Sequence, residues 1–278
     1  MHIKSQDLVN SHERADRLNR KQHQRTTTQN LQIGMNMTTL IIGASGATGR
    51  LLVEELLNHG QKVKIVVRSQ DSLPETIKNH ENLSVTQASI LNLDDAEITQ
   101  LVEGCSAVVS CLGHNMSLKG MFGGPRRLVT DATRRLCEAI RASDAKEPVK
   151  FVLMNTAGNS NRDLVEPISF GQKCVIGLLR LLLPPHIDNE MAADYLRITV
   201  GQNDPMIEWT AVRPDGLLDE TKISDYEIYR SPTRSAIFNA GTTSRINVAD
   251  FMSRLIGNND TWQVWKGQMP VIYNQQSS

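Results

Sequence analysis

From Thr38 onward, short apolar runs alternate with segments of helical periodicity. Branched and apolar side chains suit a pleated surface, so the runs predict strands over Thr39–Ile42, Lys62–Val67, Leu83–Ala88, Ala107–Leu112, Val149–Met154 and Ile207–Val212, and a final strand-like segment within Val264–Tyr273. Apolar residues at helical spacing predict helices over Thr48–Asn58, Asp94–Val102, Pro125–Ala142, Ile168–Leu183, Asn189–Thr199 and Val248–Ile256. This alternation favours a Rossmann-like α/β fold, in which helices cover both faces of a doubly wound parallel sheet.

The alternation places residues 37–278 in one domain, whose smaller C-terminal region, mainly 156–278, forms the substrate side. Residues 1–36 are different, because they are rich in Arg, Gln, Asn, Thr and His and almost lack apolar periodicity. Such a segment cannot bury enough surface to fold. Met37 stands immediately before the first predicted strand, so two interpretations remain open: a disordered extension, or an upstream start that the working protein lacks.

Composition narrows the function classes. The 30 basic and 30 acidic residues cancel, so net charge does not point to nucleic acid as a partner. No apolar run reaches the roughly 20 residues that span a bilayer, and residues 1–36 contain no apolar core of a signal peptide. The four cysteines form no C-x-x-C pair and show no metal-ligand spacing, which favours a reducing cytoplasm. We expect a cytoplasmic protein without a nucleic-acid, membrane or metal site, as a monomer or a homodimer.

Three glycines follow the first strand at G-x-x-G-x-x-G spacing, in the run Gly43, Ala44, Ser45, Gly46, Ala47, Thr48 and Gly49. Gly43 allows a tight turn out of the strand, Gly46 lets the backbone approach a pyrophosphate, and Gly49 lets the following helix pack closely. The positive end of that helix then faces the phosphates. Because a strand precedes the run and a helix follows it, the motif predicts a dinucleotide site.

The residue after the second strand indicates which dinucleotide. Many NAD sites carry Asp or Glu there, to accept hydrogen bonds from the ribose hydroxyls. This chain has Arg68 instead, whose planar fork suits a 2′-phosphate. The sequence therefore favours NADP(H) over NAD(H).

Several stretches together resemble one family. They are the glycine run, Val67-Arg68, Val108-Val109-Ser110-Cys111-Leu112-Gly113, Trp209-Thr210-Ala211-Val212-Arg213-Pro214 and Ile246-Asn247-Val248-Ala249-Asp250-Phe251. From residue 37 to about 257, the chain resembles atypical short-chain dehydrogenases/reductases of the NAD(P)H-binding, NmrA-like group, and within it the flavin/biliverdin reductase B-type proteins. The resemblance implies phosphate contacts at the glycine run and the 2′-phosphate at Arg68. It also implies adenine beside Ser89 and Ile90, the middle of the cofactor against Leu112, Gly113 and His114, and the nicotinamide beside Asn155, Thr156 and Pro214.

The chain departs from that group at two positions, and from ordinary short-chain dehydrogenases at a third. Ser72 replaces a second basic residue, and Ser89 replaces an Asp beside the adenine. The segment Tyr195-Leu196-Arg197-Ile198-Thr199 has Thr where ordinary short-chain dehydrogenases have the Lys of their Tyr-x-x-x-Lys pair. That Lys lowers the pKa of the Tyr, which then exchanges a proton with a carbonyl group. Carbonyl chemistry by this route is therefore disfavoured.

A reductase can work without such a pair if its acceptor delocalises the incoming charge. We therefore expect hydride transfer from NADPH to a small conjugated acceptor, flavin-like or quinone-like. Thr156 is a candidate hydrogen-bond donor to that acceptor, and a strand-end hydroxyl bonded to backbone is the alternative interpretation of this residue. Two other functions remain open: a non-catalytic NADP(H)-binding redox sensor of the NmrA type with a protein partner, and a sugar-nucleotide isomerase or epimerase, which the absent Lys disfavours.

Overall fold

An eight-stranded sheet forms the centre of the computed structural model, which describes residues 37–114, 123–166 and 169–275. Its strands lie in the order β3 (Leu83–Gln87), β2 (Lys62–Val67), β1 (Thr38–Ile42), β4 (Ala107–Ser110), β5 (Val149–Met154), β6 (Ile207–Pro214), β10 (Val271–Asn274) and β8 (Tyr226–Tyr229). All neighbours are parallel except β10 and β8. The predicted Rossmann-like α/β fold is thereby confirmed. The predicted extension, residues 1–36, lies outside the described residues.

The sheet reverses its winding at β1. Residue Ile41 pairs with Ile65 of β2 on one side and with Val109 of β4 on the other. The chain therefore runs from β1 outward to β2 and β3, then returns to β4 and continues in the opposite direction. In doubly wound folds, ligands bind beyond the carboxyl ends of the strands at this reversal.

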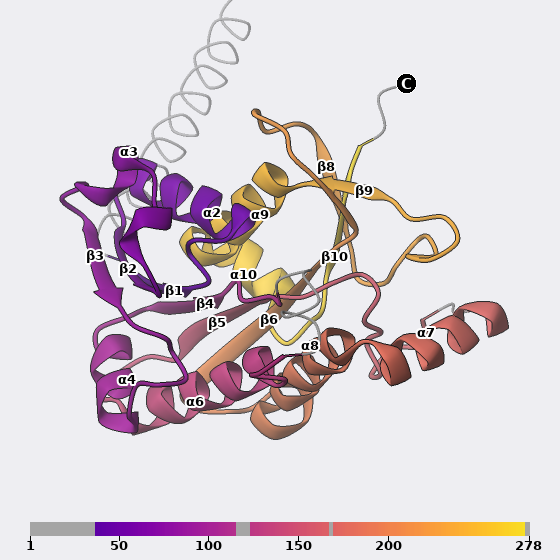
Figure 1. The fold of residues 1–278 in the computed structure, drawn as a ribbon, viewed down its shortest axis with the longest axis horizontal. Coiled ribbons are helices and arrows are strands. Elements are labelled where there is room, and N and C mark those ends of the chain that lie inside the picture. The colour runs from indigo at the N-terminus through magenta and orange to yellow at the C-terminus, as the bar shows by residue number, and fades with distance from the viewer. Residues whose placement is uncertain (1–36, 115–122, 167–168, 276–278) are drawn as a thin grey trace, which may run out of the picture.

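Helices cover both faces of the sheet (Figure 1). One face carries α2 (Ala47–Asn58), α9 (Arg245–Gly257) and α10 (Asn259–Trp265), with the short η1 (Gln70–Ser72) and α3 (Glu75–Lys78) near the β2 edge. The other face carries α4 (Asp95–Val102), α6 (Leu128–Ala142), α8 (Pro184–Asp194) and the π-helical segment η2 (Tyr195–Val200). Helix α7 (Phe170–Leu182) extends sideways from α8. Within the described residues, no helix is both long and apolar enough to cross a bilayer.

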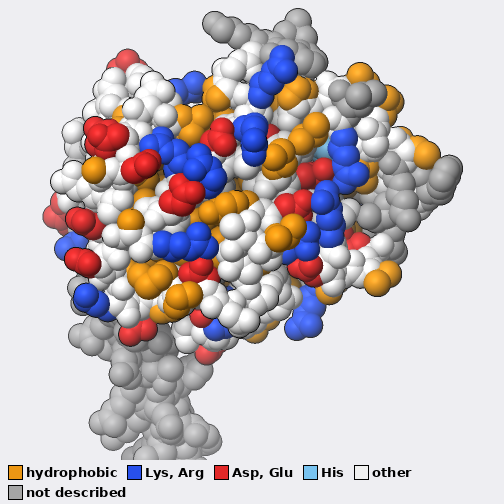
Figure 2. Space-filling model, turned by 90° about the horizontal axis from the view of Figure 1, so that it is seen from below, with side chains coloured by type: hydrophobic (Ala, Val, Ile, Leu, Met, Phe, Trp, Pro, Cys, Tyr) orange, Lys and Arg blue, Asp and Glu red, His pale blue; other side chains and the backbone are white. Residues whose placement is uncertain are grey.

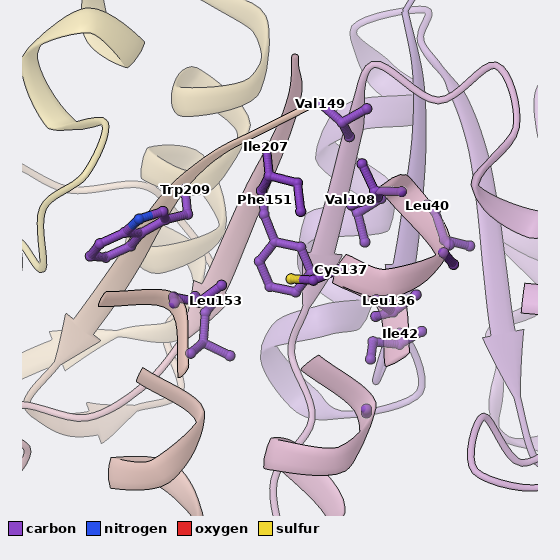
Figure 3. Close-up of a cluster of buried hydrophobic side chains, with 14 of the residues drawn as sticks. Leu40, Ile42, Val108, Leu136, Cys137, Val149, Phe151, Leu153, Ile207 and Trp209 are labelled. Atoms are coloured by element: carbon purple, nitrogen blue, oxygen red, sulfur yellow. The ribbon is translucent and has the colours of Figure 1, made fainter. Parts of the chain in front are cut away.

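Each face of the sheet has its own hydrophobic core. Beneath the sheet, Phe151 of β5 lies beside Cys137 of α6, with Val108 of the neighbouring strand close by (Figure 3). Above the sheet, Ile41 and Val152 pack with the helices of the opposite layer. Because both faces are buried, consecutive strand residues are apolar, which is why the strands read as continuous apolar runs rather than alternating ones.

Most predicted elements form within a residue or two of their expected bounds, but helix starts deviate more. Helix α6 begins at Leu128 rather than Pro125. The helix expected from Asn189 begins at Pro184, because proline fits the first turn of a helix. The strand-like segment expected within Val264–Tyr273 is confirmed by β10, although its first two residues end helix α10, which the Asn258 side chain caps by accepting a hydrogen bond from the Thr261 amide. The sequence analysis also missed strand β8 and a small second sheet of β7 (Gly216–Leu218) and β9 (Thr242–Ser244).

The surface beneath the sheet carries side chains of both charges close together (Figure 2). Two pairs on α6 illustrate this, Arg134 with Glu138 and Arg141 with Asp204. Charges that neutralise one another locally do not create the field of one sign that attracts a polyanion.

Candidate cofactor site

The turn after β1 requires glycine at two positions. Gly43 has a φ of +77°, and a Cβ there would lie 2.5 Å from the backbone carbonyl of Cys111. A Cβ on Gly49 would lie 2.3 Å from the Gly43 oxygen. Both distances are far shorter than van der Waals contact, so any side chain would push the turn away from β4 or from α2. The first and third glycines of the motif thus bring strand, turn and helix together.

The N-terminus of α2 is open to an anion. Gly46 occupies the N-cap position, where it provides no capping side chain, and the first turn contains no acidic residue. The amide groups of this turn therefore carry the positive end of the helix dipole without an internal partner. Ser45, Gly46 and Ala47 are exposed here, whereas Ala44, Thr48 and Gly49 are buried in the packing of the turn.

A cleft extends from this turn across the carboxyl ends of β1, β2, β3 and β4. Among the predicted cofactor residues, it is lined by Gly43, Ser45, Gly46, Arg68, Ser89, Ile90, Leu112 and Gly113. The cleft has a further wall, formed by Pro125 and by Leu128, the first residue of α6, which the sequence analysis missed. The start of the helix after the fourth strand, at the reversal of the sheet, was the signal that could have revealed it. None of the residues that line this cleft is Asp or Glu.

Arg68 is exposed at the end of β2 and pairs with no acidic side chain in the described part of the chain. The nearby Asp71 carboxylate accepts a hydrogen bond from the Ser69 hydroxyl at 3.0 Å. Ser72, which stands where the resemblance expects a second base, donates its hydroxyl to the Ser69 carbonyl. Arg68 is therefore the cation that the cleft presents at the end of β2.

The Cys111 side chain also lines the cleft. Burial raises the pKa of this thiol to about 12. Because the thiolate is the reactive form of cysteine, the thiol is a neutral, packing side chain at neutral pH.

His114 lies outside the cleft lining and faces α8 instead. Its Nε2 lies 2.6 Å from Oδ2 of the buried Asp188. The same carboxylate accepts hydrogen bonds from the amides of Val129 and Thr130, and so caps α6 from another helix. The His114 side chain thus connects the loop after β4 to α6 and α8.

The residues expected beside the nicotinamide follow β5 and β6. Asn155 donates to the Asn189 carbonyl at 2.9 Å, and the Pro214 carbonyl accepts from the Ala157 amide. The Thr156 hydroxyl oxygen accepts from the Gly158 amide at 3.2 Å, which matches the backbone-bonded alternative for this residue. These residues lie at the same edge of the sheet as the cleft but do not line it.

The described residues contain no group of three His, Cys, Asp or Glu side chains placed to hold a metal ion. His186, Asp188 and Glu190 lie close together along α8. However, the Asp188 carboxylate bonds to α6, and the Glu190 carboxylate bonds to Arg180 of α7. Their carboxylates therefore do not converge on one point.

The fold resembles solved oxidoreductases. A short-chain dehydrogenase/reductase from Veillonella parvula, solved in complex with NADP, is 16% identical, with a TM-score of 0.62 over 86% of this chain and 94% of that one. An oxidoreductase from Lactococcus lactis is 17% identical, with a TM-score of 0.60 over 87% and 93%. A candidate NADH-flavin reductase from Streptococcus pneumoniae is 17% identical, with a TM-score of 0.58 over 86% and 100%. At these identities the likeness concerns the fold. A search among curated proteins gave no match.

A family model agrees with both the glycine turn and the fold. The model described as NAD(P)H-binding matches residues 43–259, which is most of the chain. The match begins at the first glycine of the turn and extends beyond α9. The chain therefore belongs to the NAD(P)H-binding family.

Proposed function

We propose that the protein is an NADP(H)-dependent oxidoreductase that transfers hydride to a small conjugated acceptor, flavin-like or quinone-like. One observation carries the proposal: a single cleft joins the glycine turn, the uncapped start of α2 and Arg68, and none of its lining residues is acidic. Phosphate groups fit at the amides of α2. The bound cofactor would supply the hydride, and the protein would supply its position.

The preference for NADP(H) rests on Arg68. A guanidinium can bind a 2′-phosphate through two parallel hydrogen bonds, whereas ribose hydroxyls need an acceptor. We assign the adenine to Ser89 and Ile90 and the middle of the cofactor to Leu112 and Gly113, because these residues line the same cleft. We assign the nicotinamide to the neighbouring edge at Asn155, Thr156 and Pro214.

The preference for a conjugated acceptor rests on Tyr195. This side chain packs against the lower hydrophobic core beside Arg141, away from the cleft, and burial raises the pKa of its phenol. Thr199, four residues later, provides no cation to lower that pKa. A phenol in this state is a poor base at neutral pH, so the acceptor itself must stabilise the incoming charge.

The non-catalytic redox sensor is the second candidate, and the same placement of Tyr195 favours it. A sensor would bind NADP(H) in the cleft, and the redox state of the bound cofactor would control its contact with a protein partner. Turnover separates the two functions. Steady oxidation of NADPH with quinones or flavins supports the reductase, whereas tight binding without turnover supports the sensor.

The first test is a fluorescence titration of protein that begins at Met37 with NADPH and NADH, comparing wild type with Arg68→Ser. Because a charged hydrogen bond is lost, Arg68→Ser should bind NADPH roughly tenfold or more weakly than wild type, with NADH affinity unchanged. Arg134→Ser, which removes an exposed arginine of α6, is the matched control. If wild type binds neither nucleotide, the proposed function is wrong.

A further inference from the structure

The start of α8 lies directly on the carboxyl edge of the sheet, beside the cofactor cleft. Asp188 holds His114, the residue after the cleft-lining Gly113. The Asn189 carbonyl accepts a hydrogen bond from Asn155, at the end of β5. The first turn of α8 is therefore fixed next to the ends of β4 and β5, where the proposed function places the nicotinamide.

His186 belongs to that first turn and faces the loop after β5. Its Cε1 lies 3.9 Å from the point where a Cβ on Gly158 would stand, and the Thr156 hydroxyl oxygen lies 3.7 Å from the same point. The His186 side chain is 11% exposed. Its Nε2 is buried and has no hydrogen-bond partner in the described part of the chain. A buried polar atom in this state normally costs free energy, so its presence needs an explanation.

Glu190, one turn later on α8, lies beside this imidazole. Its Oε1 is 3.5 Å from the His186 Nε2, too far for a well-formed hydrogen bond. Arg180 of α7 holds the same carboxylate with two hydrogen bonds of 2.7 and 2.8 Å. Arg162, from the loop after β5, approaches it at 3.7 Å and also pairs with Asp194. The acid is thus fixed on one side of the imidazole.

The charge of Glu190 is also fixed. Burial raises the pKa of this carboxyl, but the His186 and Arg180 side chains outweigh burial and hold the pKa at about 2. A carboxylate therefore stands beside the imidazole throughout the physiological range. The carboxylate lies on the Nε2 side of the ring, which leaves Nδ1 as the ring nitrogen available to a bound molecule.

We propose that His186 is the proton donor to the acceptor, and that Glu190 and Arg180 are its positioning residues. This inference rests on the proposed function. The bound cofactor would supply a hydride, with its two electrons, to the acceptor and would be oxidised to NADP⁺. Negative charge then collects on an oxygen or nitrogen of the acceptor. The Nδ1–H bond of the His186 imidazolium breaks as that heteroatom gains the proton, and water reprotonates the imidazole.

The inference names a substrate class. An acceptor whose reduced form carries a proton on oxygen or nitrogen, such as a quinone, gains from a donor beside the nicotinamide. We therefore expect menadione to be reduced with participation of His186.

The experiment compares NADPH oxidation with menadione by wild type, His186→Gln and Glu190→Gln across a pH series. Loss of a general acid lowers kcat by about 10²-fold, and we expect this for His186→Gln with NADPH affinity unchanged. Wild-type kcat should fall with rising pH, because neutral imidazole is a far poorer proton donor than imidazolium. His186→Gln should show a flat profile, and added imidazole should restore part of its rate. A structural role alone would alter neither the profile nor the rescue.

His59→Gln is the matched control, because His59 forms a similar pair with Glu55, at 3.6 Å, near the far end of α2. This variant should keep the wild-type rate and profile. Equal kcat and equal pH profiles for wild type and His186→Gln would overturn the inference. Bound NADPH without any turnover would overturn it together with the reductase, whereas failure to bind NADPH would refute the proposed function first. Thermal unfolding of each variant shows whether the fold is retained.

Discussion

The Arg213 guanidinium and the Glu166 carboxylate form a two-pronged ion pair in which both side chains are almost fully shielded from water, 0% and 2% exposed. Arg213 is the second-last residue of β6, and Glu166 belongs to the loop after β5. The guanidinium also donates to the carbonyls of Asn159, Met269 and Arg230. One side chain thus joins the substrate-side segments to the end of the sheet.

Removal of one partner of this ion pair should strongly lower the free energy of unfolding. Glu166→Ala leaves a buried positive charge without compensation, which costs about 3–5 kcal/mol in comparable proteins. We expect urea unfolding to show a loss of that size. The double variant Arg213→Met, Glu166→Leu should be more stable than Glu166→Ala, because no uncompensated charge remains. A Glu166→Ala protein as stable as wild type would contradict the ion-pair interpretation.

Substitution by alanine should have opposite effects at Gly49 of the glycine turn and at Gly177 of α7. Gly49→Ala places a methyl group against the Gly43 carbonyl, so both the free energy of unfolding and NADPH affinity should fall. Gly177→Ala, in the middle of α7, meets nothing within 4 Å. That substitution should raise stability by up to about 1 kcal/mol, since alanine favours helix. Chemical denaturation and nucleotide titration of both variants measure the contrast.

The four cysteines should differ sharply in reactivity. Cys174 is exposed, whereas Cys105 and Cys137 are buried and burial raises the pKa of each of their thiols. A thiol reagent at pH 8 should label Cys174 rapidly in the native protein and all four after denaturation. Cys174→Ser should abolish the rapid phase. Rapid native labelling that survives this substitution would mean that another cysteine is accessible.

The low pKa of the Glu190 carboxyl predicts that the folded state loses stability at acidic pH. Its folded pKa, about 2, lies below the unfolded value of 4.5. The folded state therefore binds fewer protons, and the stabilisation is complete above pH 4.5 and lost as pH falls toward 2. Glu190→Gln should be less stable than wild type at pH 6, and the difference should shrink between pH 4.5 and 2. A constant difference across that window would contradict the assigned pKa.

The sequence predicted those parts of the fold that depend on neighbouring residues. Strand β1, the glycine turn and α2 follow from local periodicity and from the conformational freedom of glycine. The place of Arg68 in the cleft followed from its position directly after β2. The cleft wall at Pro125 did not, because it depends on how α6 packs across the sheet.

Contacts between residues that are far apart in the sequence could not be predicted from it. His114 was assigned to the cofactor, yet its side chain bonds to Asp188, 74 residues later. Arg213 was recognised as part of a motif, but nothing local indicates that Glu166 and three carbonyls would enclose it. Helix α10 was not expected, although the cap at Asn258 and the burial of Trp262 favour it.

The position of β10 has a consequence for synthesis on the ribosome. This strand lies between β6 and β8, although both leave the ribosome before it does. Until residues 268–274 emerge, the outer edge of β6 is an open template for strand pairing, and the Arg213 charge lacks the Met269 carbonyl. The nascent chain thus carries an unsealed edge from the synthesis of β6 until that of β10. Open edges of this kind favour misassembly until their partner strand arrives.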